Sequence, residues 1–319
     1  MSNFETSAHR SRLATDVEDE IDLREVFGIL WRGKWAILAT TVFFAVAGVF
    51  YALSKPNVYE ASALLAPVQN EGSAGIGGQL SGLASLAGLS LGGGEANRTA
   101  IAKEVLQSRA FLSSFIRRHQ LSVPLMGANG WSFEKQAWEY ESGVYDPASG
   151  EWGVNEAGDT LKPSDWDLVK AFRGQLSINQ NKDNGMITIA VSSLSPLAAA
   201  EWTELLVNDI NEHMRSQDIE EAEASIAYLE AKLNETNIAG MQQVFYQLIE
   251  SETRTVMLAN AQREYVFQTV DPAVVPQEKS GPKRALIAVT ATILGGMLGV
   301  FIVFVVAFIR TGRKETETI

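Results

Sequence analysis

The sequence contains no cysteine at any of its 319 positions. Disulfide bonds, thiolate metal sites and cysteine nucleophiles are therefore excluded together. Histidine is almost as scarce, since only His9, His119 and His213 occur, and no two of them have the spacing of a zinc motif such as His-Glu-x-x-His. We expect neither a metal centre nor a bound cofactor.

Motifs that bind nucleotide phosphates are missing as well. Residues 72–94 are rich in glycine, but they lack the Gly-Lys-Ser/Thr ending and the tight strand-to-helix turn of the nucleotide motifs. We interpret this stretch as a surface loop in which residues 80–89 can form short helical pieces. The acidic residues within 201–223 are interpreted as a solvated helix face, and we predict that the protein is not an enzyme.

Positively charged residues are fewer than negatively charged ones. The sequence has 26 Lys and Arg residues and 38 Asp and Glu residues, which gives a formal net charge of −12. Nucleic-acid partners require clustered cations to contact their phosphates. The composition therefore argues against a nucleic-acid partner and fits a solvated, mutually repelling surface.

The apolar residues are concentrated in two uncharged runs, residues 35–53 and residues 285–309. Each run is long enough, as a helix, to cross the roughly 30 Å hydrocarbon layer of a bilayer. A cleaved signal peptide is the alternative for the first run, but the sequence that follows it, Tyr51 to Pro56, is a poor cleavage site. A buried core helix is the alternative for the second run, which is longer than the usual soluble helix.

Cations near the two runs predict the topology. Arg32 and Lys34 precede the first run, and three cations follow the second, so both termini are expected in the cytoplasm of a bacterial inner-membrane protein. Lys55, Lys283 and Arg284 on the other side weaken this signal. The predicted layout is a cytoplasmic segment at 1–34, a transmembrane helix at 35–53, a periplasmic domain at 54–284, a second transmembrane helix at 285–309 and a short cytoplasmic tail at 310–319.

An amphipathic helix is predicted just before the first run. Asp22 followed by Glu25 is a plausible helix start, and the apolar residues recur at helical spacing on one face: Leu23, Val26, Phe27, Leu30 and Trp31. We expect this face to lie along the membrane surface, with packing on a partner protein as the alternative.

The first two-thirds of the domain mixes strands and helices. Residues 58–67 alternate like a strand with Tyr59, Ala61, Ala63 and Leu65 on one face, and residues 98–119 have helical periodicity. Residues 123–163 are predicted to be an irregular loop anchored by tryptophans 131, 138 and 152. A helix capped by Ser164 is predicted to run to Phe172, followed by a β-hairpin formed by residues 175–179 and 186–191.

The last third is dominated by long helices. Nothing breaks a helix over residues 196–232, and a second helix is expected over about 241–266, after the interruption at Asn234, Asn237 and Gly240. The simplest geometry is a long antiparallel hairpin, at about 196–266, that protrudes from an α/β base. Residues 266–270 are predicted to form a strand.

Two motifs lie at the second run. Pro272, Pro276, Pro282 and Lys283 form a stiff, extended approach, because proline fixes φ and cannot continue a helix. Within the run, Gly295 and Gly299 form a small-xxx-small face that lets helices approach closely, next to Gly296; chance glycines are the alternative.

The order of these parts resembles the Wzz family of polysaccharide co-polymerases, the chain-length determinants. The resemblance rests on Glu20 to Leu23, Leu30 to Trp35, Tyr59 to Ser62, the Leu-Ala-Gly-rich residues 80–91 and the proline motif from Asp271 to Arg284. It implies an α/β base near the membrane, a long helical protrusion, and ring-like homo-oligomers that act with a membrane polysaccharide polymerase and its growing lipid-linked glycan. Some relatives continue into a tyrosine kinase, but only ten residues follow Ile309.

The resemblance implies a role in setting the chain length of O-antigen, the lipopolysaccharide glycan, or of a related surface polysaccharide. An export subunit for exopolysaccharide or capsule that works with a separate kinase is the alternative within the family. A ligand-sensing receptor would need a cytoplasmic output module, for which neither terminus offers room. A glycan-modifying enzyme stays open because scattered carboxylates can converge in a fold.

Overall fold

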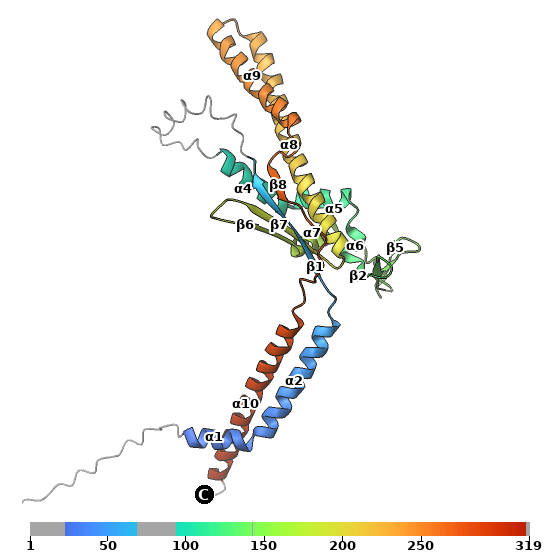
Figure 1. Ribbon diagram of the computed structural model, residues 1–319, viewed down its shortest axis with the longest axis vertical. Helices are drawn as coiled ribbons and strands as arrows, with labels where there is room; N and C mark the ends of the chain where they lie inside the picture. Colours follow the sequence, from blue (N-terminus) through green and yellow to red (C-terminus); the bar gives the residue numbers. More distant parts are fainter. Residues whose placement is uncertain (1–22, 69–93, 142, 317–319) are drawn as a thin grey trace, which may run out of the picture. The chain divides into compact units, whose positions relative to one another are not determined.

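The computed structural model describes residues 23–68, 94–141 and 143–316, in two compact units (Figure 1). The first unit comprises Met1–Lys55 and Lys283–Ile319, and the second is Pro56–Pro282. The expected loop at 72–94, with its helical pieces, lies outside the described residues.

The first unit is built from three helices: α1 (Leu23–Arg32), α2 (Lys34–Ser54) and α10 (Arg284–Thr316). Both α2 and residues Arg284–Ile309 of α10 are long and apolar enough to cross a membrane. Their large side chains are mostly exposed, as for Phe50 at 76% and Phe308 at 83%. Exposed apolar surface of this extent requires an apolar surrounding, and the two helices fit an inner-membrane protein.

Helix α1 carries an exposed aromatic pair. Phe27 and Trp31 stack with 5.8 Å between ring centroids, and the Lys34 ammonium lies 4.7 Å from the Trp31 ring centroid. Aromatic rings beside cations are typical of the membrane–water interface, and the position of this helix along the membrane surface stays a prediction.

A four-stranded antiparallel sheet in the order β6-β7-β1-β8 organises the second unit. Strand β1 (Tyr59–Pro67) buries alternate residues, so the face predicted from the sequence is confirmed. The predicted hairpin is confirmed as β6 (Leu176–Gln180) and β7 (Ile187–Ser193), and β8 (Phe267–Asp271) lies at the other edge.

Four shorter helices add to the core: α4 (Gly94–Gln107), α5 (Arg109–Arg118), α6 (Ser122–Met126) and α7 (Asp165–Gln175). The helical periodicity predicted over residues 98–119 is confirmed, and the structure divides this stretch into two helices, α4 and α5, at Ser108. The Ser108 hydroxyl accepts a hydrogen bond from the Phe111 N–H and so begins a new helix, α5. The Ser164 cap of α7 is confirmed, and the helix extends beyond the predicted Phe172.

Residues 123–163 are more regular than predicted. They form α6 and two small hairpins, β2 (Ala128–Ser132) with β3 (Ala137–Tyr140) and β4 (Tyr145–Asp146) with β5 (Glu151–Trp152). Aromatic residues pair across each hairpin, Trp131 with Trp138 and Tyr145 with Trp152. Such cross-strand pairs stabilise strands that are too short to show a clear alternation in the sequence.

The helical hairpin consists of α8 (Pro196–Glu235) and α9 (Ala239–Ala261), which pack against each other (Figure 1). The Ser195 hydroxyl caps α8, and Pro196 occupies its first turn. The α9 helix ends earlier than the predicted residue 266. The backbone N–H groups of Tyr265, Val266 and Phe267 donate to the side-chain oxygen of Asn211 in α8, so they do not continue the helix.

Candidate functional site

The predicted transmembrane glycines lie where α10 contacts α2. A Cβ on Gly299 would collide with Thr40 Oγ1 and lie 2.9 Å from Ile37 Cα, and a Cβ on Gly295 would lie 2.5 Å from Phe44 Cβ. Gly296 has more room, since its Cβ would lie 3.5 Å from Thr41 Oγ1. The two helices approach too closely at Gly295 and Gly299 for a larger residue. That these glycines act as a packing contact in a bilayer stays a prediction.

The proline motif joins β8 to α10 without a helix. Just before Pro282, Val58 and Gly281 form an isolated bridge, in which the Val58 N–H donates to the Gly281 carbonyl at 3.0 Å. Pro272 is exposed and Pro276 is partly buried. In the first unit Lys283 is exposed, and the next residue, Arg284, donates to the Ala52 carbonyl at 3.1 Å. In each unit, a hydrogen bond therefore joins the chain near the end of α2 or the start of β1 to the chain near the start of α10.

The α8–α9 hairpin presents apolar side chains that nothing in the described chain covers. On α9 they recur along one side of the helix, which we call the α9 stripe: Met241 at 45% exposure, Val244 at 51%, Leu248 at 45% and Leu258 at 39%. Near the tip, Tyr228 and Ile238 are each 63% exposed. A soluble surface seldom exposes so many aligned apolar residues unless another surface covers them.

The hairpin is fastened at its base by a charged contact. Asp218 of α8 pairs with Arg98 of α4, and the Tyr265 hydroxyl donates to the Asp218 carboxylate at 2.8 Å. The Arg98 guanidinium also lies over the Tyr265 ring at 4.4 Å. These three side chains are distant in sequence, and they join the middle of α8 to α4 and to the residues just before β8.

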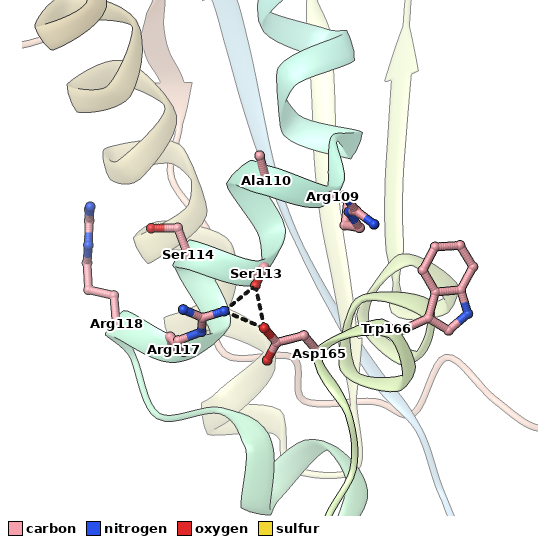
Figure 2. A pocket seen from close by; sticks show the side chains of 8 residues that line it. All are labelled: Arg109, Ala110, Ser113, Ser114, Arg117, Arg118, Asp165 and Trp166. Atoms are coloured by element: carbon pink, nitrogen blue, oxygen red, sulfur yellow. Dashed lines mark hydrogen bonds and ion pairs between the residues drawn. The ribbon is translucent and has the colours of Figure 1, made fainter.

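A groove of about 730 Å³ lies between α5 and the first turn of α7 (Figure 2). Small side chains of α5 line it at helical spacing, Ala110, Ser113 and Ser114, and its charged and aromatic residues are Arg109, Arg117, Arg118, Asp165 and Trp166. The sequence did not indicate this groove, because its two sides are about 50 residues apart and each resembles an ordinary solvated helix surface.

Two arginines of the groove are held by carboxylates. Arg117 pairs with Asp165 and donates to Ser113 Oγ at 3.3 Å, and Ser113 Oγ lies 3.4 Å from the same carboxylate. At the opposite end, Arg118 pairs with Asp209 of α8 at 3.1 Å. Arg109 makes no side-chain hydrogen bond or ion pair within the part of the chain that the structure describes.

Among the described residues, no group of three or more His, Asp and Glu side chains could hold a metal ion. His119 contacts Asp209 at 3.1 Å, His213 packs edge-on against Phe111, and His9 lies outside the described residues. The acidic residues of α8 that the sequence assigned to a solvated face are exposed: Glu201, Glu212, Glu220, Glu221 and Glu223.

Two protein-family models match the chain. Residues 19–119 match the chain length determinant protein, Wzz, and residues 235–308 match GNVR, the G-rich domain on putative tyrosine kinase. The chain is therefore similar to a Wzz domain in its first part and to a GNVR domain in its last part. The resemblance to the Wzz family of polysaccharide co-polymerases, predicted from the sequence, is confirmed.

No curated protein sequence matches the chain. Among solved structures, a full-length bacterial polysaccharide co-polymerase is 14% identical, covers 91% of this chain and 99% of its own, and has a TM-score of 0.37. A fragment of the co-polymerase WzzB from Salmonella Typhimurium is 11% identical over 70% of this chain and 100% of its own, with a TM-score of 0.31.

Proposed function

We propose that this protein is a co-polymerase that regulates the chain length of a bacterial surface polysaccharide, with the O-antigen of lipopolysaccharide as the first candidate. The observation that carries the proposal is the Wzz match over residues 19–119, which includes the first apolar helix and the first strand of the sheet. The protein itself performs no bond-forming step. It acts on a membrane polysaccharide polymerase and on the lipid-linked glycan that this polymerase extends.

The proposed arrangement places α2 and α10 across the inner membrane, with both termini in the cytoplasm and the second unit in the periplasm. Two helices of suitable length and composition support it, together with Arg32 and Lys34 at the cytoplasmic side of α2. In this arrangement the proline motif from Pro272 to Lys283 lies where the periplasmic unit meets the bilayer. Gly295 and Gly299 hold the two membrane helices close together.

Ring-like homo-oligomers are part of the proposal. The α9 stripe supports it, because four aligned apolar side chains remain exposed in a single chain and the same surface on a neighbouring copy could cover them. An assembly of this kind would hold several membrane helix pairs around the polymerase. The assembly could then change how long one growing glycan stays bound to the polymerase, and so how long that glycan becomes.

The experiment that tests the proposal is deletion of the gene in its host, followed by gel separation of the surface polysaccharide. We expect the clustered length distribution to become random after deletion and to return with a complementing copy. A copy that lacks α9 and the tip is the matched control and should not restore the clustering. An unchanged O-antigen ladder in the deletion strain would contradict the O-antigen role.

The GNVR match over residues 235–308 favours one second candidate. That domain is described on putative tyrosine kinases, so the chain could serve as an export subunit for exopolysaccharide or capsule that acts with a separate kinase. In this case deletion abolishes or shortens a secreted polysaccharide and leaves the lipopolysaccharide ladder unchanged. Measuring both glycans in the same strain separates the two candidates.

A further inference from the structure

We infer that the groove between α5 and α7 binds a sugar residue that carries a carboxylate, within the glycan whose length the protein regulates. The inference rests on the proposed function for the source of the ligand. The geometry of Arg109, Arg117, Asp165 and Trp166 carries it.

The aromatic side of the groove is Trp166. Its side chain is 63% exposed on the first turn of α7, and Figure 2 shows the indole on the same side of the groove as Arg109. An indole offers a flat apolar face with a polar edge, and it is costly to leave in water. The apolar C–H face of a pyranose ring fits such a platform, and the sugar hydroxyls remain free to form hydrogen bonds at the ring edge.

The floor of the groove leaves space for a ring. Ala110, Ser113 and Ser114 follow one another at the i, i+3 and i+4 positions of α5, so small side chains line one face of this helix. A volume of about 730 Å³ lies within the range of small-ligand sites. The serine hydroxyls and the Asp165 carboxylate supply the short polar contacts that sugar hydroxyls require.

The charge of the groove favours an anionic sugar. Asp165 engages Arg117 and Asp209 engages Arg118, whereas Arg109 is exposed and has no charged partner among the described residues. A guanidinium binds a carboxylate through two parallel hydrogen bonds, which gives orientation as well as attraction. Arg109 therefore offers its guanidinium to a carboxylate on the same side of the groove as the exposed indole of Trp166.

The Arg117–Asp165–Ser113 contact prepares the site. Arg117 and Asp165 lie at the middle of the groove in Figure 2, joined to each other and to Ser113. Because these groups are already paired, binding does not have to immobilise them. Arg109 then supplies the charge contact and Trp166 the stacking contact.

The test is binding of tetragalacturonate by the full-length protein in nanodiscs of neutral lipid, measured by NMR saturation transfer and titration. A neutral tetrasaccharide of galactose is the comparison ligand. We expect tetragalacturonate to bind more tightly than the neutral sugar. Arg109→Gln and Trp166→Ala should each weaken its binding by about tenfold, the usual effect of losing one charge-assisted or aromatic contact.

Arg254→Gln is the matched control, because it removes an exposed arginine from α9 and should leave binding unchanged. Arg109 and Trp166 are exposed, so circular dichroism should show that both variants keep the native fold. Equal affinity for the acidic and neutral sugars, or unchanged binding by Arg109→Gln, would overturn the charge recognition. Unchanged binding by Trp166→Ala would show an anion site without sugar recognition and would also overturn the inference.

This experiment is independent of the chain-length assay. It uses purified protein without a polymerase, so a failure of sugar binding leaves a positive deletion result intact. A negative deletion result likewise leaves measured binding intact and points to another glycan process.

Discussion

The side-chain amide of Asn211 in α8 bonds to the backbone of Phe267 through both its nitrogen and its oxygen. Its Nδ2 donates to the Phe267 carbonyl at 2.9 Å, and its Oδ1 accepts the Phe267 N–H at 2.9 Å. The same oxygen also accepts the N–H groups of Tyr265 and Val266. With Asn211 only 5% exposed, these bonds are shielded from water and fasten the long helix to the edge strand β8.

We expect Asn211→Leu to lower the free energy of unfolding by about 3 kcal/mol, because several buried backbone groups would lose their partner. Asn208→Leu makes the same change one turn away at an exposed position and should have a small effect. Urea unfolding of both full-length variants, followed by circular dichroism, checks the difference. Equal midpoints for the two variants would show that the Asn211 bonds contribute little.

Features set by local sequence signals could be predicted. The alternation of Tyr59 to Leu65 predicted the buried face of β1, and Ser164 predicted the start of α7, because each signal acts over a few residues. The long apolar stripe of α8 likewise predicted its length within a few residues. These elements need little information from the rest of the fold.

Features set by tertiary contacts could not be predicted. The end of α9 depends on Asn211, about 50 residues away, and the two small hairpins depend on aromatic pairs such as Trp131 with Trp138. The groove requires α5 and α7 to lie together, so Arg109 and Trp166 gave no joint signal in the sequence. Residue spacing alone does not reveal which distant surfaces meet.

The glycines of α10 should respond differently to the same substitution. Gly299→Ala would place a methyl group against Thr40 and the Ile37 backbone, whereas Gly296→Ala has room beside Thr41. We expect Gly299→Ala to destabilise the α2–α10 pair by about 1–3 kcal/mol, as overpacked contacts do, and Gly296→Ala to have little effect. Unfolding of the full chain in mild detergent by added dodecyl sulfate measures both. If the two variants unfold alike, Gly299 is not a close-contact position.

Ser164 and Asp167 form a capping box at the start of α7, in which each side chain bonds to the backbone N–H of the other residue. This arrangement predicts that the stability of the protein depends on pH. The Ser164 hydroxyl donates to the Asp167 carboxylate at 2.6 Å, and the Ser164 N–H donates to it at 3.2 Å. These bonds hold the pKa of Asp167 below its ordinary value, with Lys170 adding a weaker attraction. The resulting stabilisation is therefore complete above the unfolded-state pKa and is lost as the pH falls through the folded-state pKa.

Ser164→Ala should raise the pKa of Asp167 toward its ordinary value and reduce this acid dependence. Carboxyl NMR titration of the full chain measures the shift. Asp146 is an internal control, because the Ala148 N–H and the Ser149 hydroxyl lower its pKa independently of Ser164. An unchanged Asp167 titration in the variant would contradict the hydrogen-bond explanation.

The α9 stripe predicts a charge-sensitive assembly. Val244→Glu should shift the purified protein to smaller oligomers, because a carboxylate would have to be buried at the contact between copies. Thr253→Glu adds the same charge at an exposed polar position on the side of the same helix away from the stripe and should leave the assembly unchanged. Mass photometry of the detergent-solubilised chain distinguishes them. Assembly that resists Val244→Glu would require a contact away from the stripe.

The absence of cysteine permits a direct test of the proposed topology, because any introduced thiol is the only one in the chain. Ala157→Cys places a thiol at an exposed position of the second unit, and Ser11→Cys places one in the segment assigned to the cytoplasm. A maleimide that cannot cross the inner membrane should label Ala157→Cys in intact cells. It should label Ser11→Cys only after the inner membrane is opened. Labelling of both thiols in intact cells, or of Ser11→Cys alone, would reverse the assignment that Arg32 and Lys34 support.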